Sequence, residues 1–481
     1  MLKLHLLALL LLCVGCGAPE GKITEIVILS TNDIHATFEQ MPKVVTFANE
    51  LRSRSENLIV LDAGDHCTGN PYVDMAEPQG APIHMLINMV GYDYGAVGNH
   101  EFDYKLLGYK KGIETMGLQT LCANANFEGT ILEGHIKPYD IFEVDGIRVA
   151  IVSFIQIDDS GLPSSMPENM EGITFVDGVT KSQEYKFLRD SADLVIGLIH
   201  LGFESDSLMV CQNPMFDIII GGHSHTHIPT GRVINGVLVT QTGSRLKGVG
   251  VSNIRLKNGE VILVTNQVVS LSDVERDPVA QRFVEECKVT SPLNNPIGKV
   301  DITLSKVGLI NMVSDVIRER SGADIAIQNS GSIRIDSLSR GVISESKIYE
   351  LEPFRNTIVT QKLALEQIKE MIITKFNGTG SESRTIDLST SGMTYEIYVG
   401  EDGLATSVKC YDIHGKEMAD RVYRVATSNY VNSAYIYAGK GKATPLDGGV
   451  FIAETVVSAI KRCDTYKGDN QRRVSIIKPT I

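Results

Sequence analysis

Residues 26–35 read IVILSTNDIH, an apolar run that ends in Asp33 and His35. Four later segments repeat this design, with an apolar run followed by acidic, amide or imidazole side chains: LIVLDAGDH (58–66), YGAVGNHEFD (94–103), LVIGLIH (194–200) and DIIIGGHSH (217–225). Runs that are apolar at consecutive positions are typical of strands covered on both faces. The five segments therefore predict a sheet-based α/β architecture in which polar residues follow buried strands.

The polar residues after these runs offer oxygen and nitrogen donors. Ligand sites in α/β sheets lie at the carboxyl ends of strands, so five such ends can bring their side chains into one crevice. This mixed donor set contains no thiolate, and it suits Zn, Mn or Fe better than Ca or Mg, which prefer oxygen alone. The candidate metal ligands are Asp33, His35, Asp65, Asn99, His200, His223 and His225.

The number of donors predicts two divalent ions, because seven are too many for one tetrahedral ion. They divide naturally if Asp65 bridges a pair of ions roughly 3.5–4 Å apart. Such a pair lowers the pKa of a bridging water and clamps an anionic group rich in oxygen, which is what phosphoester hydrolysis requires. A lone histidine at a strand end is more often solvated, but five of the 11 histidines follow apolar runs here.

The order D-x-H, G-D, G-N-H-E, H and G-H-x-H closely resembles that of the calcineurin-like metallophosphoesterases. The forms TNDIH, DAGD, GNHEFD and GGHSH resemble the 5′-nucleotidase branch, a periplasmic or surface family with a second, nucleotide-binding domain. This resemblance implies an α/β chain with a four-layer metallophosphoesterase sandwich, followed by a smaller α/β C-terminal nucleotidase domain.

The resemblance also implies a role for each donor. One ion would be held by Asp33, His35, Asp65 and His225, and the other by Asp65, Asn99, His200 and His223. His100, oriented by Asp103, would stabilise the phosphoryl oxygens or the leaving group, which agrees with the electrostatic role expected of an imidazole beside developing charge. Ala36 stands where the family usually has glycine, and this costs little unless the turn needs a positive φ.

The C-terminal block resembles the nucleotidase C-terminal domain. In N-S-G-S-I-R (329–334) and P-F-R-N (353–356), the positions that hold the nucleotide in the family are Asn329, Arg334, Phe354 and Asn356. An arginine can donate paired hydrogen bonds to phosphate or ribose oxygens. A base can stack on the ring of a phenylalanine, which contributes roughly 1–3 kcal/mol to binding. The chain has no tryptophan, so a base must stack on Phe or Tyr.

Two departures from the family concern the substrate. The stretch LSKVGLINMVSD (304–315) lacks the usual arginine before its helix start, and ATSNYVNSAYIYAGKGKATPLDGG (426–449) replaces the family's G-G-D-G-aromatic loop. Tyr435 or Tyr437 is the candidate for the second stacking aromatic. We predict a 5′-nucleotidase, with a phosphodiesterase or nucleotide-sugar diphosphatase (2′,3′-cyclic nucleotide or UDP-sugar type) as the alternative enzyme. The alternative outside enzymes is a non-catalytic, nucleotide-binding envelope lipoprotein.

The first residues predict export. Residues 1–21 contain an apolar run that is too short to span a bilayer and that ends in a lipobox-like Cys-Val-Gly-Cys (13–16), which is typical of a signal peptide. Cys16 would then become the lipidated first residue of a protein of the cell envelope, in the periplasm or on the outer surface. An ordinary cleaved signal peptide is the alternative, and any membrane attachment is expected through this end alone.

Three further segments are predicted after the signal peptide. A metallophosphoesterase domain is expected over 22–270, a helical linker over 271–296 and the substrate-binding domain over 297–481. The linker is predicted from the helical apolar spacing of Val279, Phe283 and Cys287, followed by the breaker-rich SPLNNPIG.

Charge and cysteine content narrow the possible partners. Lys plus Arg number 45 against 58 Asp plus Glu, a net charge of −13, so we expect a small nucleotide and no nucleic-acid polymer. The cysteines after Cys16 show no C-x-x-C spacing and are expected to be buried thiols, with any pairing left open. The other six histidines, His5, His66, His84, His135, His227 and His414, are expected not to bind metal. His66 and Cys67 directly follow Asp65 and could line the pocket, but packing is expected of them. The sequence carries no signal for the oligomeric state.

Overall fold

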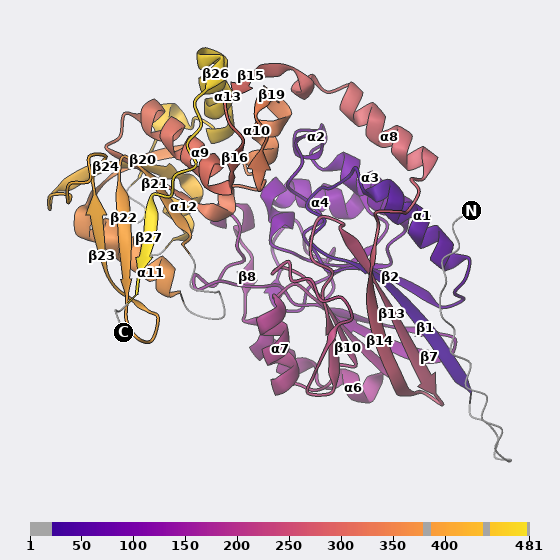
Figure 1. Cartoon of the computed structure of the whole chain (residues 1–481). Coiled ribbons are helices and arrows are strands. Elements are labelled where there is room, and N and C mark those ends of the chain that lie inside the picture. Colours follow the sequence, from indigo (N-terminus) through magenta and orange to yellow (C-terminus); the bar gives the residue numbers. More distant parts are fainter. Residues whose placement is uncertain (1–21, 379–385, 436–442, 479–481) are drawn as a thin grey trace.

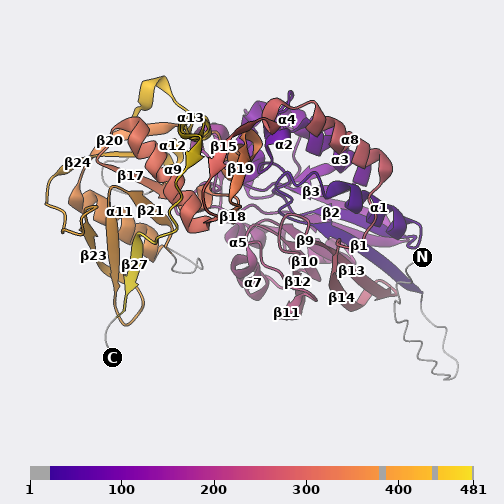
Figure 2. The ribbon, with the colours of Figure 1, turned by 45° about the horizontal axis from the view of Figure 1, so that its top comes forward.

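The computed structural model describes residues 22–378, 386–435 and 443–478. The predicted signal peptide with Cys16, and also Tyr437, lie outside the described residues. The chain forms an N-terminal part and a smaller C-terminal part, which lie side by side in both views (Figures 1 and 2).

The N-terminal part contains two six-stranded sheets. The first has the order β14-β13-β1-β2-β3-β4, in which β1 to β4 are parallel and β13 and β14 are antiparallel additions at one edge. Its strands are β1 (Ile23–Thr31), β2 (Leu58–Asp62), β3 (Tyr94–Ala96), β4 (Gln119–Leu121), β13 (Gly248–Lys257) and β14 (Glu260–Ser270).

The second sheet has the order β11-β12-β10-β9-β7-β6, with parallel inner strands and an antiparallel strand at each edge. Its strands are β6 (Tyr139–Val144), β7 (Ile147–Val152), β9 (Leu194–Ile199), β10 (Ile218–Gly221), β11 (Arg232–Ile234) and β12 (Val237–Thr240). All six residues of β9 are buried, as its continuous apolar sequence predicts.

The two sheets pack face to face, and helices cover their outer faces. On β1, Ile26 and Ile28 point into the core between the sheets, whereas Leu29 points to the helix side, because side chains alternate along a strand. The helices on the first sheet are α1 (Met41–Arg52), α3 (Ala81–Val90) and α8 (Pro278–Val289), and α7 (Phe203–Gln212) lies on the second. The four-layer sandwich expected from the sequence is thus confirmed.

Helix α8 lies within the stretch predicted as a linker and runs along α1 and α3 before the chain enters the C-terminal part (Figure 1). Asp277 caps its first turn by accepting hydrogen bonds from the main-chain N–H groups of Val279 and Ala280. The sequence analysis predicted that the apolar face of this helix starts at Val279, but the buried face starts one residue later. Ala280 and Val284 are the buried residues, whereas the side chain of Val279 is 65% exposed. The domain bounds themselves stay a prediction.

The C-terminal part is also mixed α/β. Its central sheet has the order β21-β17-β24-β20-β25, with strands β17 (Ile325–Asn329), β20 (Ile358–Ala364), β21 (Leu388–Ser391), β24 (Val422–Ser428) and β25 (Thr444–Pro445). Two three-stranded sheets flank it: β19 (Gly341–Ser344), β15 (Pro296–Val300) and β26 (Thr465–Tyr466), and β23 (Ala405–Tyr411), β22 (Thr394–Val399) and β27 (Val474–Ile477). The helices are α9 (Lys306–Ser321), α10 (Glu345–Leu351), α11 (Leu365–Asn377), α12 (Asn429–Ala434) and α13 (Ile452–Cys463).

The cysteines follow the prediction only in part. Within the described ranges all six are unpaired. Cys67, Cys122 and Cys410 are buried as expected, but Cys211 and Cys463 are exposed because they lie on outward positions of α7 and at the end of α13. None of the helices that the structure describes is both long and apolar enough to cross a bilayer.

Candidate metal centre and active site

The predicted donors follow parallel strands of both sheets. They lie after β1 (Asp33, His35), β2 (Asp65), β3 (Asn99), β9 (His200) and β10 (His223, His225), and the catalytic candidate His100 directly follows Asn99. The carboxyl ends of these strands meet at one edge of the sandwich, so residues up to 190 positions apart in the chain become neighbours.

One group of donors consists of Asp33, His35 and His225, whose ligand atoms lie within 4.8 Å of one another. The Nε2 atoms of His35 and His225 are 2.9 Å apart, and His225 Nε2 is 3.3 Å from Asp33 Oδ1. Asp65 Oδ2 lies 3.9 Å from His35 Nε2 and so borders this group.

A second group consists of Asp65, His200 and His223. Asp65 Oδ2 lies 3.2 Å from His200 Nε2, and His223 Nδ1 lies 3.0 Å from Asn99 Oδ1. His200 is oriented from its other side, because its Nδ1 bonds to the carbonyl oxygen of Ala63 at 2.6 Å. Asp65 therefore lies between the two groups, the position expected of a bridging ligand.

Main-chain hydrogen bonds hold the loops that carry these donors. The N–H groups of Asp33 and His35 donate to the carbonyl oxygens of Gly64 and Asp65. The buried Glu101 carboxylate accepts from the N–H groups of Asp65 and Gly98 at 3.0 and 2.6 Å. Glu101 is a supporting residue that sequence reasoning missed, although it stands in the quoted GNHEFD.

The backbone at the donors is strained. Five of the seven donors have φ between 46° and 75°, as does the neighbouring Ala36; the five are Asp33, His35, Asp65, His223 and His225. Such left-handed conformations are uncommon outside glycine and cluster at functional sites. The turn at Ala36 does need a positive φ (50°), so the alanine there carries a conformational cost that glycine would avoid.

His100 forms a chain of hydrogen bonds with Asp103 and Ser165. Its Nδ1 lies 2.7 Å from Asp103 Oδ2, and Ser165 Oγ donates to Asp103 Oδ1 at 2.8 Å. The Nε2 of His100 is left on the cavity side, 4.0 Å from Asp65 Oδ2. Burial alone would lower the pKa of His100, but Asp65 and Asp103 outweigh it and raise that pKa.

Charge at the centre is concentrated on the pair formed by Asp65 and His200. Burial would raise the pKa of Asp65, but His200 and His100 hold that pKa well below its usual range. Burial likewise opposes the charge on His200, yet Asp65 raises the pKa of His200 to about 10. Burial and then Arg334 lower the pKa of His35. The centre therefore holds an ionised carboxylate that attracts positive charge.

All four predicted substrate residues line one cavity of about 230 Å³ together with donors of the N-terminal part. The lining includes Asp65, Asn99, His100, His223, His225, Asn329, Arg334, Phe354, Asn356 and Tyr430. The ring of Phe354 is stacked on that of His100, with 5.6 Å between centroids and 23° between planes. Arg334 reaches His35, with 3.1 Å from Nη2 to Nε2, so it uses a nitrogen that a metal ion would also use.

Among the described residues, the second aromatic that lines the cavity is Tyr430; Tyr435, one of the two candidates, does not line it, and Tyr437 lies outside the described residues. Tyr435 is buried in the C-terminal core, and its hydroxyl bonds to Asp387. Tyr430 is the second residue of α12 and lies five positions before Tyr435, but the altered loop gave no register with which to select it.

Residues 26–227 match the calcineurin-like phosphoesterase family, and residues 291–435 match the 5′-nucleotidase C-terminal domain. The fold and the donor set thus define a phosphoesterase of the metal-dependent, calcineurin-like class. With both domains in one polypeptide, the chain belongs to the 5′-nucleotidase family.

Individual relatives agree with this membership. The chain is 26% identical to the trifunctional nucleotide phosphoesterase protein YfkN of Bacillus subtilis, over 86% of this chain and 32% of that protein. It is 24% identical to protein UshA of Yersinia enterocolitica, over 85% and 86% of the two chains. This chain spans about a third of the length of YfkN and of the B. subtilis endonuclease YhcR.

The structure of a 5′-nucleotidase precursor from Thermus thermophilus has the same fold, with a TM-score of 0.81. It is 23% identical in sequence, and the match covers 94% of this chain and 99% of that one.

Proposed function

We propose that this chain is a divalent-metal-dependent phosphohydrolase that releases phosphate from nucleoside 5′-monophosphates. The observation that carries the proposal is the single cavity between the predicted metal ligands and the predicted nucleotide residues. A phosphate held beside Asp65 would leave its nucleoside against Phe354 and Arg334. Relatives named 5′-nucleotidase support the same substrate class.

The side of the cavity formed by the N-terminal part is called the N-terminal wall and includes Asp65, Asn99, His100, His223 and His225. This wall suits two cations, because Asp65 is shared between the two groups of donors described above. Asp33 and Asp65 are almost fully buried, and buried carboxylates require compensating positive charge. His200 Nε2 is buried 3.2 Å from Asp65 Oδ2, and because Nδ1 is held by the carbonyl oxygen of Ala63, Nε2 is the nitrogen that would bind an ion in place of its proton. When bound, two divalent ions lower the pKa of a water and neutralise phosphoryl oxygens. Zn or Mn fits this donor set best.

His100 would stabilise the transition state directly. Asp103 holds its Nδ1 and thereby points Nε2 into the cavity. Because Asp65 and Asp103 favour the protonated ring, Nε2 can donate to a phosphoryl or leaving oxygen. Asp103 and Ser165 act as positioning residues.

The opposite side of the cavity, called the C-terminal wall, includes Asn329, Arg334, Phe354, Asn356 and Tyr430 and would select the nucleotide. Phe354 and Tyr430 offer two aromatic faces for a base, and Arg334 offers a fork for phosphate or ribose oxygens. Asn329 and Asn356 are buried at the same wall, where Asn356 Nδ2 donates to Glu352 Oε1 at 2.6 Å.

We also propose that the protein acts outside the cytoplasm. The support is the signal-peptide pattern of residues 1–21, and Cys16 would carry the lipid anchor to the cell envelope.

One assay tests this function. The mature chain is stripped of metal, reloaded with Mn or Zn, and given AMP, a nucleotide sugar, a 2′,3′-cyclic nucleotide and an aryl phosphate. We expect the reloaded protein to prefer AMP and the stripped protein to be inactive. A preference for the nucleotide sugar or the cyclic nucleotide would favour the alternative phosphodiesterase or diphosphatase activity. The absence of hydrolysis in every reloaded sample would refute the proposal that the chain is an enzyme.

A further inference from the structure

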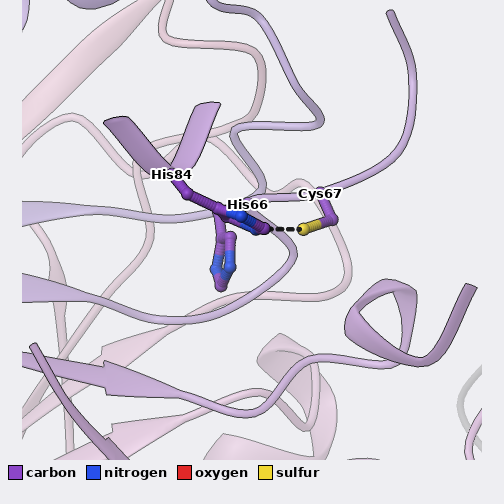
Figure 3. A group of neighbouring side chains, drawn as sticks. All are labelled: His66, Cys67 and His84. Atoms are coloured by element: carbon purple, nitrogen blue, oxygen red, sulfur yellow. Dashed lines mark hydrogen bonds between the residues drawn. The ribbon is translucent and has the colours of Figure 1, made fainter. Parts of the chain in front are cut away.

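Three side chains form a second cluster of possible metal ligands beneath the loop that carries Asp65. His66 and Cys67 follow β2, and His84 lies on α3 (Figure 3). One ligand atom from each lies within 4.8 Å of the others. Cys67 Sγ is 3.7 Å from His84 Nε2, and the rings of His66 and His84 are 6.1 Å apart. All three residues are buried, with exposures of 2–4%.

One ring nitrogen of His66 has no hydrogen-bond partner. Nε2 is buried and makes no hydrogen bond among the residues the structure describes, whereas Nδ1 lies beside carboxylates. Leaving a buried polar atom unpaired destabilises the folded protein, so Nε2 indicates a missing partner.

The surroundings of His66 resemble those of a ligating histidine. Its Nδ1 faces two buried carboxylates, with 3.3 Å to Glu101 Oε1 and 3.5 Å to Asp62 Oδ2. Histidines that bind metal usually direct one nitrogen to a carboxylate and offer the other to the ion. Nε2 of His66 is the nitrogen left to offer.

His84 is held in place by the backbone around it. A side-chain carbon added at Gly80 or Gly112 would come within 2.7 or 2.8 Å of its ring. The ring therefore fills a slot that only glycine leaves open, and its Nε2 points to the sulfur of Cys67.

We propose that His66, Cys67 and His84 form an additional Zn²⁺ site, separate from the nitrogen- and oxygen-ligated phosphoesterase centre. A thiolate and two imidazoles are preferred ligands of zinc. Asp62 and Glu101 add the negative charge that a buried dication needs. The ion would brace the Asp65 loop, because the carbonyl oxygen of His66 accepts from Ala36 N–H and its N–H donates to Glu101.

Cobalt tests this site without relying on activity. The full-length, metal-stripped protein is titrated with Co²⁺ and its near-ultraviolet absorption is recorded. Thiolate bound to Co²⁺ gives an intense charge-transfer band, and the predicted phosphoesterase ligands include no thiolate. We expect the band to appear in the wild type and to saturate within three equivalents, the number that the two-ion centre and the additional site would bind together. Its absence at saturating Co²⁺ would overturn the proposal.

Variants assign the band to a residue. Cys67→Ser should lose the band and hold one zinc fewer than the wild type by elemental analysis. Cys122→Ser, another buried thiol of the N-terminal part, should keep both. A band and zinc content unchanged in Cys67→Ser would also overturn the proposal. His84→Gln is the second variant, with the same expectation, in case Cys67→Ser fails to fold.

Discussion

The two walls of the cavity hold their polar side chains in different ways. In the N-terminal wall, the donors sit on strained turns directly after parallel strands, and these turns are hydrogen-bonded to one another. In the C-terminal wall, Arg334 and Phe354 lie on loops and reach across to His35 and His100. The local backbone therefore sets the geometry of the first wall, whereas the second depends on how the two parts of the chain meet.

Two buried carboxyl groups show the same contrast. Asp65 is surrounded by imidazoles, which keep its pKa low although burial would raise it. Burial raises the pKa of Glu352 to about 8, because Asn356 offers one neutral hydrogen bond in place of a positive charge. Asp65 is thus held as a charged group in the first wall, whereas Glu352, which bonds to Asn356 of the second wall, is held as a neutral one.

The largest expected effect comes from removing charge in the first wall. Asp65→Asn should lower kcat/KM for AMP and for an aryl phosphate by at least about 10³-fold, because both groups of ligands lose their shared carboxylate. Steady-state kinetics and the bound-metal content check this. Asp145→Asn, an exposed carboxylate of the same part, is the control. Activity within about threefold of wild type would rule out the bridging role.

Removal of His100 should have the next largest effect. His100→Ala should lower kcat by about 10²–10³-fold with little change in KM, since the imidazole acts on charge that develops in the transition state. The exposed His414→Ala variant serves as control. A change confined to KM would show that His100 binds substrate and does not stabilise the transition state.

The pH dependence of stability tests whether Glu352 is neutral in the folded protein. The unfolded chain releases this proton near the ordinary pKa of 4.5, but the folded chain keeps it until about pH 8. Stability should therefore fall as the pH rises from about 4.5 to 8, by up to about 4 kcal/mol. Glu352→Gln should lose this part of the pH dependence, as measured by chemical denaturation of the metal-free protein at pH 5 and 8.

The partly exposed Glu350→Gln is the matched control for this measurement and should keep the wild-type dependence. Equal pH slopes in wild type and Glu352→Gln would mean that Glu352 is ionised in the folded protein.

The strands and the grouping of donors were predictable from the sequence. Apolar runs at consecutive positions mark buried strands, and parallel strands bring their carboxyl ends to one edge, so Asp33 and His200 could be expected to meet. The metal assignments and the His100 role remain predictions that the geometry is compatible with.

Other parts of the site depend on packing that has no periodic signal. Ser165 reaches Asp103 from an irregular loop 62 positions away. His84 reaches Cys67 only because α3 packs behind β2, and Tyr430 enters the cavity through the orientation of α12. None of these contacts follows from spacing along the chain.

The most direct test of the division between the walls is the ratio of kcat/KM for AMP to that for an aryl phosphate. Phe354→Ala should lower this ratio by about 5- to 150-fold, equivalent to roughly 1–3 kcal/mol of lost stacking, and Tyr430→Ala should act in the same direction. His100→Ala should lower the rates on both substrates by at least about 10²-fold. Equal losses on both substrates in Phe354→Ala and Tyr430→Ala would contradict the assignment of nucleotide selection to the C-terminal wall.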